Sequence, residues 1–343
     1  MNSANRNADS TVPPAAALLR MMTGYWLAQA VYVVAKLRVA DLLAQGPMSI
    51  DALASATGAN ADALFRLLRA LYGVGVFSSV GPRTFALTPM SELLRSDTPQ
   101  SMRALAMTYN EELYRAWGDL LYSVKTGKPA FDHVFGGGPF EYFAQHPEAD
   151  RTFNEALVGY TNQVAEAVVA AYDFSAIGSV VDVGGGYGRL VASILQASPL
   201  ATAVLFEQSH VIDGASEFLA SQAVKHRTTC VAGDFFEHVE PNAQMYVLSQ
   251  ILHDWDDERC RVILRNCRRA MDSGARLLVV EYVLGSGENA SFGEWLDLHM
   301  LVCAGGRERT RDEFAALLSD AGFSIERVVP TAAGPSIVEA VPN

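Results

Sequence analysis

The pattern of apolar and polar residues changes about halfway along the chain. In the second half, short runs of valine, leucine and isoleucine alternate with stretches whose apolar residues recur about once per helical turn. The runs predict buried strands, and the stretches between them predict amphipathic helices. The predicted strands are residues 179–183, 202–206, 228–231, 244–249, 276–283, 324–329 and 336–341. Helices between most of these strands indicate a parallel, doubly wound, Rossmann-like α/β sheet.

The first half of the chain is patterned mainly as helix. Residues 15–43 predict one or two long helices with apolar residues on more than one side, and a partner subunit is the plausible cover for the second side. Residues 49–58 and 60–71 predict two short capped helices, followed by a hairpin that turns at Gly81-Pro82. Two short helices and a hairpin make a winged helix.

The length of 343 residues favours two domains. We expect a winged-helix dimerisation domain over residues 15–100 and a second domain over residues 101–343. Within the second domain, residues 101–171 are helical and rich in large aromatic side chains. Aromatic residues at this spacing more often form a core, but they are also the best candidates for the walls of a flat apolar pocket. Residues 172–343 carry the sheet.

Charge bears on the winged helix, a shape that also binds DNA. The chain has a net charge of −12, and the second short helix carries only Arg66 and Arg69 as cations, with Asp62 beside them. Because phosphate contacts need clustered cations, dimerisation is favoured and no nucleic-acid partner is expected.

The remaining composition indicates a reduced, cytoplasmic protein. The four cysteines, at 230, 260, 267 and 303, form neither a C-x-x-C pair nor a cysteine–histidine ligand spacing. Residues 1–10 are polar, unlike a signal peptide, and charged residues interrupt the apolar stretch 21–44. We therefore expect neither a zinc site nor a membrane partner.

A glycine-rich turn follows the first predicted strand. Asp182, Gly184, Gly186 and Gly188 form the pattern D-x-G-x-G-x-G, whereas a dinucleotide-binding G-x-G-x-x-G would need glycine where Arg189 stands. The pattern resembles the first motif of S-adenosylmethionine (SAM) methyltransferases. The alternative is a glycine-rich turn that binds another nucleotide or no ligand.

Chemically suitable residues follow the next two predicted strands. Ligands of open α/β sheets bind beyond the carboxyl ends of the strands. Glu207 can accept hydrogen bonds from both hydroxyls of a ribose. In the run Gly233-Asp234-Phe235, the carboxylate can accept from an adenine amine, and the aromatic ring can cover the base. These positions favour an adenosyl ligand, although Glu207 alone could be a surface charge.

His253 follows the fourth predicted strand and is the candidate general base. A phenol has a pKa of about 10, so ionising it at pH 7 costs about 4 kcal/mol, and a neutral imidazole can take that proton during attack. Glu281 and Glu308 are candidates to orient the imidazole and stabilise its charged form, unless they form surface ion pairs with nearby arginines.

The order of motifs DVGGGYG, GDFF, HDWDD, VVEYVL and GGRERT, behind a winged helix and a helical segment, is similar to that of SAM-dependent O-methyltransferases of the plant caffeate and bacterial antibiotic-tailoring type. The resemblance implies a class I methyltransferase fold, a homodimer joined through the N-terminal domain, and His253 as base between Glu281 and Glu308. S-adenosyl-L-methionine would be the cofactor and S-adenosyl-L-homocysteine the product. No metal is needed, since the sulfonium methyl is already activated.

The resemblance also implies binding residues. Cofactor contacts would come from Gly184, Glu207, Asp234, Phe235 and Ser249, and the candidate site also includes Asp182, Gly186, Gly188 and Gly233. The acceptor would lie among Asn154, Leu157, Asp254, His299 and Met300. His299 is equally compatible with a buried structural histidine.

One departure points to a branch of the family. Plant members usually carry Lys-Trp where this chain has Ser249-Gln250, so a lysine contact to the cofactor is replaced by a hydroxyl. This resembles the bacterial branch that methylates phenazines, anthracyclines and similar fused aromatics. The predicted function is methyl transfer from SAM to a hydroxyl of such a secondary metabolite.

Three alternatives remain at this point. The same fold can methylate a heteroaromatic nitrogen, which needs less help from a base. Some SAM-binding relatives in antibiotic pathways hydroxylate or decarboxylate instead. A winged-helix regulator that senses SAM or an aromatic ligand is a third possibility, disfavoured by the absence of a basic face in the sequence.

Overall fold

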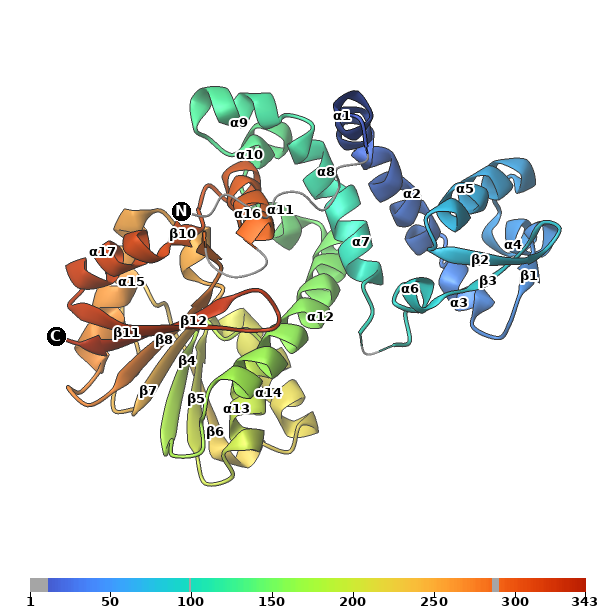
Figure 1. Ribbon diagram of the computed structural model, residues 1–343. Coiled ribbons are helices and arrows are strands. Elements are labelled where there is room, and N and C mark those ends of the chain that lie inside the picture. Colours follow the sequence, from blue (N-terminus) through green and yellow to red (C-terminus); the bar gives the residue numbers. More distant parts are fainter. Residues whose placement is uncertain (1–11, 99, 286–289) are drawn as a thin grey trace. The chain divides into compact units, whose positions relative to one another are not determined.

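A computed structural model describes residues 12–98, 100–285 and 290–343 (Figure 1). The polar segment 1–10, which is not expected to be a signal peptide, lies outside the described residues. The chain forms two compact units, one of Met1–Tyr114 with Pro147–Gly159 and the other of Arg115–His146 with Tyr160–Asn343. The helical segment 101–171 is thus shared between the units, whereas the sequence assigned all of it to the second domain. The proposed domain limits stay a prediction.

The first unit begins with three helices, α1 (Pro14–Met22), α2 (Gly24–Lys36) and α3 (Val39–Leu43), rather than one or two. The helix is interrupted at Thr23, whose hydroxyl donates a hydrogen bond to the Leu19 carbonyl. It is interrupted again at Arg38, which has a left-handed φ of 55°. Helix α1 has no buried residue. Its apolar side chains therefore face solvent in the single chain.

The winged helix follows as predicted. Helix α4 (Ile50–Thr57) is capped by the Ser49 hydroxyl, and α5 (Ala61–Gly73) by the Asn60 side chain. Strands β2 (Phe77–Gly81) and β3 (Thr84–Leu87) form the hairpin, and β1 (Met48–Ser49) pairs with the other edge of β3. The unit also contains α6 (Pro89–Glu92) and α7 (Arg103–Asn110).

The remaining helices of the 101–171 segment are short until the last. They are α8 (Glu112–Trp117), α9 (Leu120–Thr126), α10 (Ala130–Phe135), α11 (Pro139–Gln145) and α12 (Pro147–Ala171). Helices α9 and α10 pack against α16 (Ala290–Cys303) within the second unit. The helical prediction for this segment is confirmed.

The second unit is built on a seven-stranded sheet in the order β11-β12-β8-β7-β4-β5-β6 (Figure 1). Its strands are β4 (Ser179–Val183), β5 (Thr202–Glu207), β6 (Thr228–Ala232), β7 (Met245–Ser249), β8 (Arg276–Glu281), β11 (Phe323–Pro330) and β12 (Ser336–Pro342). All seven predicted strands are present, and five of them pair in parallel.

The expectation of a wholly parallel sheet is wrong for the last strand. Strand β12 runs antiparallel to both β8 and β11. Only residues 331–335 link β11 to β12, and such a short link permits only a hairpin, because a parallel connection needs about a dozen residues or more.

Helices cover both faces of the sheet (Figure 1). Leu277 and Val279 of β8 face a core shared with α15 (Asp257–Ala270) and α17 (Arg311–Asp320). Leu278 and Val280 face the opposite core, shared with α12, α13 (Arg189–Ala197) and α14 (Ser209–Ser221). Because successive side chains of a strand point to opposite faces, burial on both faces explains the unbroken apolar runs in the sequence.

Four smaller elements complete the second unit. They are the 3₁₀ turns η1 (Lys225–Arg227) and η2 (Leu252–Asp254) and the parallel pair β9 (Val283–Leu284) and β10 (Arg309–Thr310). Thr310 and Glu313 form a capping box at the start of α17. Among the described helices, none is both long and apolar enough to cross a membrane.

Candidate active site

The carboxyl ends of the parallel strands bring the predicted cofactor residues to one edge of the sheet. The glycine turn follows β4, Glu207 ends β5, Gly233 follows β6, and Ser249 ends β7. In an open α/β sheet, this edge is where ligands bind.

The glycine turn leads from β4 into α13. Gly184, Gly186 and Gly188 have φ values of 71°, 57° and 81°, which favour glycine. A Cβ on Gly184 would lie 2.7 Å from the Ile251 side chain and 3.3 Å from the Phe235 ring, whereas a Cβ on Gly186 would meet nothing within 4 Å. The turn is therefore packed on one side and open at Gly186, where the backbone can approach a ligand.

Two carboxylates support this turn. The Gly186 amide donates to Glu207 Oε2 at 2.9 Å, and the Gln208 amide donates to Oε1 at 2.7 Å. A carboxylate has about four acceptor sites, so Glu207 can still accept from two ribose hydroxyls. Asp182 is buried beneath the turn, and burial, reinforced by the charge of Glu207, raises its pKa to about 7.

Hydrogen bonds and ring contacts fix the segment after β6. The Phe236 amide donates to Asp234 Oδ1 at 2.8 Å, and the buried Asn266 side chain donates to the Phe235 carbonyl at the same distance. The Phe235 ring lies edge-on to Trp255, with centroids 6.3 Å apart. A Cβ on Gly233 would lie 2.4 Å from the Phe206 ring, so only glycine fits there. The open glycine turn and this fixed aromatic ring fit an adenosyl group.

His253 lies on η2, beyond the carboxyl end of β7, with a side chain 11% exposed. Its Nδ1 is 2.8 Å from Glu308 Oε1 and 3.7 Å from Glu281 Oε2, and its Nε2 is 3.6 Å from Asp254 Oδ1. Because an ionised carboxylate only accepts hydrogen bonds, the contact with Glu308 places the proton on Nδ1. In the neutral imidazole, Nε2 is then the atom that can take a proton from a substrate.

The surrounding carboxylates make His253 a strong base. Burial alone lowers the pKa of His253, but the charges of Glu281 and Asp254 and the hydrogen bond to Glu308 outweigh it and raise the pKa to about 10. Burial raises the pKa of Glu281 and that of Asp254, each opposed by the nearby imidazolium.

The two glutamates predicted to flank His253 have different roles. Glu308 contacts the imidazole directly, and its buried Oε2 has no hydrogen-bond partner among the described residues. Glu281 accepts the amides of Ile251 and Leu252 at 2.9 and 2.8 Å through Oε1 and the Gln250 side chain at 3.3 Å through Oε2. Glu281 therefore anchors the start of η2 as well as contributing charge.

The segment Gly306–Thr310, named the strap below, passes directly against η2. The Arg307 amide donates to the His253 carbonyl at 2.8 Å, and a Cβ on Gly306 would lie 1.9 Å from the same oxygen. The Glu308 amide donates to Asp297 Oδ1 at 2.9 Å. Sequence reasoning found Glu308 but missed Gly306, Gln250 and Arg309, which also hold η2.

The predicted acceptor residues divide between the two units. Asp254, His299 and Met300 belong to the same unit as His253, whereas Asn154 and Leu157 lie on the part of α12 that belongs to the first unit. The proposed contacts of Asn154 and Leu157 with the acceptor stay a prediction.

His299 has a partner that the sequence did not indicate. The indole nitrogen of Trp117 donates to His299 Nδ1 at 2.9 Å, and the two rings are stacked with 18° between their planes. Burial, assisted by the charge of His253, lowers the pKa of His299 to about 4. The ring is therefore neutral, with its proton on Nε2.

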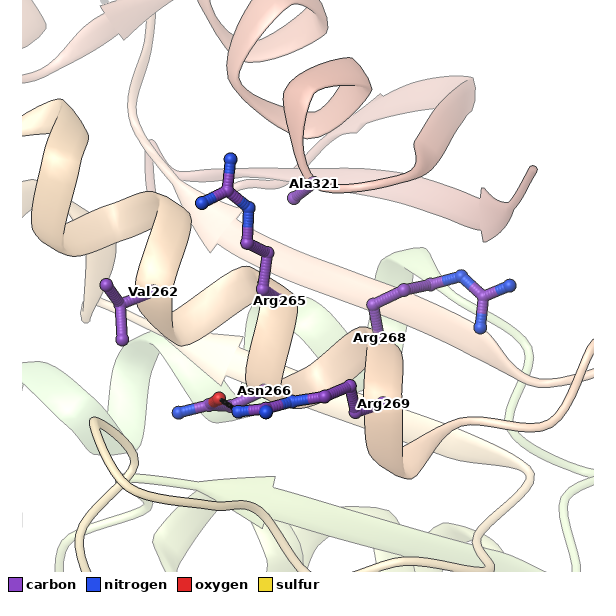
Figure 2. Close-up of a pocket in the computed structure, with 6 residues that line it drawn as sticks. All are labelled: Val262, Arg265, Asn266, Arg268, Arg269 and Ala321. Carbon is purple, nitrogen blue, oxygen red and sulfur yellow. Dashed lines mark hydrogen bonds between the residues drawn. The ribbon is translucent and has the colours of Figure 1, made fainter.

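A surface hollow of about 380 Å³ lies on α15 and the end of α17 (Figure 2). It is lined by Val262, Arg265, Asn266, Arg268, Arg269 and Ala321. Arg268 and Arg269 lie in the last turn of α15, where cations interact favourably with the free carbonyls of the helix, so no ligand is needed to explain them.

Two known domain families match the chain. An O-methyltransferase domain matches residues 117–324, and an O-methyltransferase dimerisation domain matches residues 19–97. The chain is a member of the O-methyltransferase family. It is therefore an enzyme that uses SAM as methyl donor, and its first unit carries the family's dimerisation domain.

Several relatives of this O-methyltransferase are known. It is 53% identical to the phenazine O-methyltransferase of Lysobacter antibioticus, over 98% of each chain. The crystal structure of LaPhzM matches it with a TM-score of 0.91 and 53% identity, over 97% of this chain and 100% of the other. The neocarzinostatin enzyme NcsB1, solved with S-adenosyl-L-homocysteine and 1,4-dihydroxy-2-naphthoic acid, matches with a TM-score of 0.80 and 34% identity, over 92% and 96%. The phenazine-1-carboxylate N-methyltransferase of Pseudomonas aeruginosa is 34% identical, over 94% and 95%.

Proposed function

We propose that this O-methyltransferase methylates a hydroxyl of a fused-ring aromatic secondary metabolite, such as a phenazine, with His253 as general base. The observation that carries the proposal is the His253–Glu308 pair at the ligand-binding edge of the sheet, in a chain 53% identical to a phenazine O-methyltransferase. The bicyclic acceptor bound by NcsB1 supports the fused-ring class.

The proposed chemistry is a single displacement assisted by a proton transfer. When bound, SAM supplies a methyl group activated by the sulfonium. The acceptor hydroxyl gives its proton to Nε2 of His253 as its oxygen bonds to the methyl carbon, and the carbon–sulfur bond breaks to leave S-adenosyl-L-homocysteine. The resulting imidazolium keeps its proton on Nδ1, which donates a hydrogen bond to Glu308 Oε1 at 2.8 Å. A phenol of pKa about 10 and a histidine whose pKa is raised to about 10 are matched for this transfer.

The cofactor contacts are also part of the proposal. Glu207 would bind the ribose hydroxyls, Asp234 the adenine amine and Phe235 the adenine face, while Ser249 would offer a hydroxyl. The open backbone at Gly186 supports this arrangement. Calorimetric titration with S-adenosyl-L-homocysteine tests it. The Kd should rise at least tenfold over wild type in Glu207→Ala. It should stay within twofold of wild type in Glu258→Ala, a control at an exposed residue.

We propose that no metal takes part, although His253, Glu281 and Glu308 offer ligand atoms within 4.8 Å of one another. Nδ1 is engaged by Glu308, and Glu281 already accepts two backbone amides and the Gln250 amide. A metal would have to break this network. Turnover should be unchanged after incubation with EDTA and gel filtration, and a loss that Mg²⁺ or Zn²⁺ restores would refute the proposal.

We further propose that the enzyme works in the cytoplasm as a homodimer, without nucleic-acid or membrane partners. Its net charge of −12 supports the absence of nucleic acid. A mobility shift of DNA at low salt would contradict this.

N-methylation is the second candidate, because the relative from Pseudomonas aeruginosa is an N-methyltransferase. Product analysis separates the two. With SAM carrying a ¹³C-methyl group and a hydroxyphenazine acceptor, O-methylation gives a labelled methoxy carbon signal, whereas N-methylation gives a labelled carbon at an N-methyl shift. A product without the added methyl mass would instead indicate hydroxylation or decarboxylation.

A further inference from the structure

Arg309 is a fully buried charged side chain next to the proposed base. It is 1% exposed and is the largest of the fully buried side chains in the described part of the chain. Its backbone lies in β10, where it pairs with Val283 of β9. Burying a guanidinium is costly unless its donors are paired, so the partners of Arg309 show what holds it there.

Those partners are backbone carbonyls on either side of His253. Nη1 donates to the Leu252 carbonyl at 2.9 Å, and Nη2 donates to the Trp255 carbonyl at 2.9 Å. Nε and Nη2 also donate to Asp257 Oδ1, at 3.0 and 2.8 Å. The guanidinium thus bridges the two ends of the turn that carries His253 to the first residue of α15.

Other groups of the same region also donate to backbone carbonyls of this turn. The Cys260 thiol donates to the Leu252 carbonyl at 3.2 Å, and the Arg307 amide donates to the His253 carbonyl. Glu308, the residue before Arg309, holds the imidazole itself. Consecutive strap residues therefore fix the side chain and the backbone of the same histidine.

We infer that Arg309 is a positioning residue for methyl transfer, which holds the η2 backbone so that Nε2 of His253 stays aligned for the proton it accepts. The inference rests on the proposed role of His253. It also explains why arginine is needed: a planar fork can bond two carbonyls and a carboxylate at once, whereas a lysine ammonium is a single point that cannot span the same three acceptors. A small displacement of a catalytic group is enough to cost a large factor in rate.

A double-mutant cycle tests this role. The variants are Arg309→Lys, His253→Ala and the double variant, measured for kcat, acceptor KM and S-adenosyl-L-homocysteine binding, with Arg261→Lys as control. Arg261 lies on the same helix α15 and pairs on the surface with Asp320 at 2.9 Å. We expect Arg309→Lys to lower kcat at least tenfold, with product affinity and acceptor KM within about threefold of wild type. In the His253→Ala background, the same substitution should change kcat less than twofold.

Each result decides a different question. An equal loss in both backgrounds, or no loss in Arg309→Lys, overturns the positioning role. An unchanged rate in His253→Ala overturns the base instead, whatever Arg309 does. If Arg309→Lys does not fold, Asp257→Asn provides the milder test, since Asp257 is 42% exposed and orients the guanidinium from outside. It should then lower kcat in the wild-type background only, and an equal loss in both backgrounds would again refute the role.

Discussion

At the scale of single residues, the site depends on how one histidine is surrounded by charge. Three carboxylates lie within 3.7 Å of the ring nitrogens of His253. They raise its pKa, so that the group is charged at neutral pH in the absence of ligands and becomes a base as the pH rises through the pKa.

The pH dependence of the reaction should report this environment. Since the neutral imidazole is the active form, log(kcat/KM) should rise with pH below the pKa of His253. In Glu308→Gln, loss of the carboxylate 2.8 Å from Nδ1 lowers that pKa, so the rising limb should move to lower pH. The plateau should also fall about 10- to 100-fold, because the imidazolium is less stabilised. A pH–rate profile of both enzymes measures this.

Glu258→Gln serves as the matched control, because Glu258 is exposed on α15. Its profile should coincide with that of the wild type. A Glu308→Gln profile with an unmoved limb would show that Glu308 does not set the pKa of the base.

At the scale of elements, the strap and the short 3₁₀ turn η2 form one local structure. Gly306 permits the contact, since a Cβ there would lie 1.9 Å from the His253 carbonyl oxygen. Gly306→Ala should force this backbone apart, destabilise the protein by about 1–3 kcal/mol and lower kcat. Gly274→Ala is the control, because a Cβ on Gly274 meets nothing within 4 Å. Chemical denaturation and turnover together test the contact, and equal behaviour of the two variants would contradict it.

The elements themselves were largely predictable, because their signals are local. Apolar runs predicted the central strands to within a residue or two. The antiparallel direction of β12 could also have been predicted, since only residues 331–335 link it to β11. The bonds from Arg309 to Leu252 and from Trp117 to His299 join residues 57 and 182 positions apart, and no local periodicity reports such pairs.

At the scale of the whole molecule, the first unit presents apolar side chains that the single chain leaves uncovered. Met21 is 77% exposed and Trp26 is 62% exposed, and both lie within the matched dimerisation domain. We expect a homodimer that buries this surface. Trp26→Glu should shift the mass measured by light scattering toward that of a monomer, whereas Leu200→Glu, at a position 94% exposed in the other unit, should not. A wild-type mass equal to one chain would contradict the prediction.

The central claim about the whole enzyme is that methyl transfer depends on His253. Its most direct test is the single-turnover rate of methyl transfer from labelled SAM to a hydroxyphenazine, with wild-type enzyme and His253→Ala compared at saturating concentrations of both substrates. We expect a rate about 10²- to 10⁴-fold lower in the variant, with cofactor binding retained. A rate within twofold of wild type would contradict it.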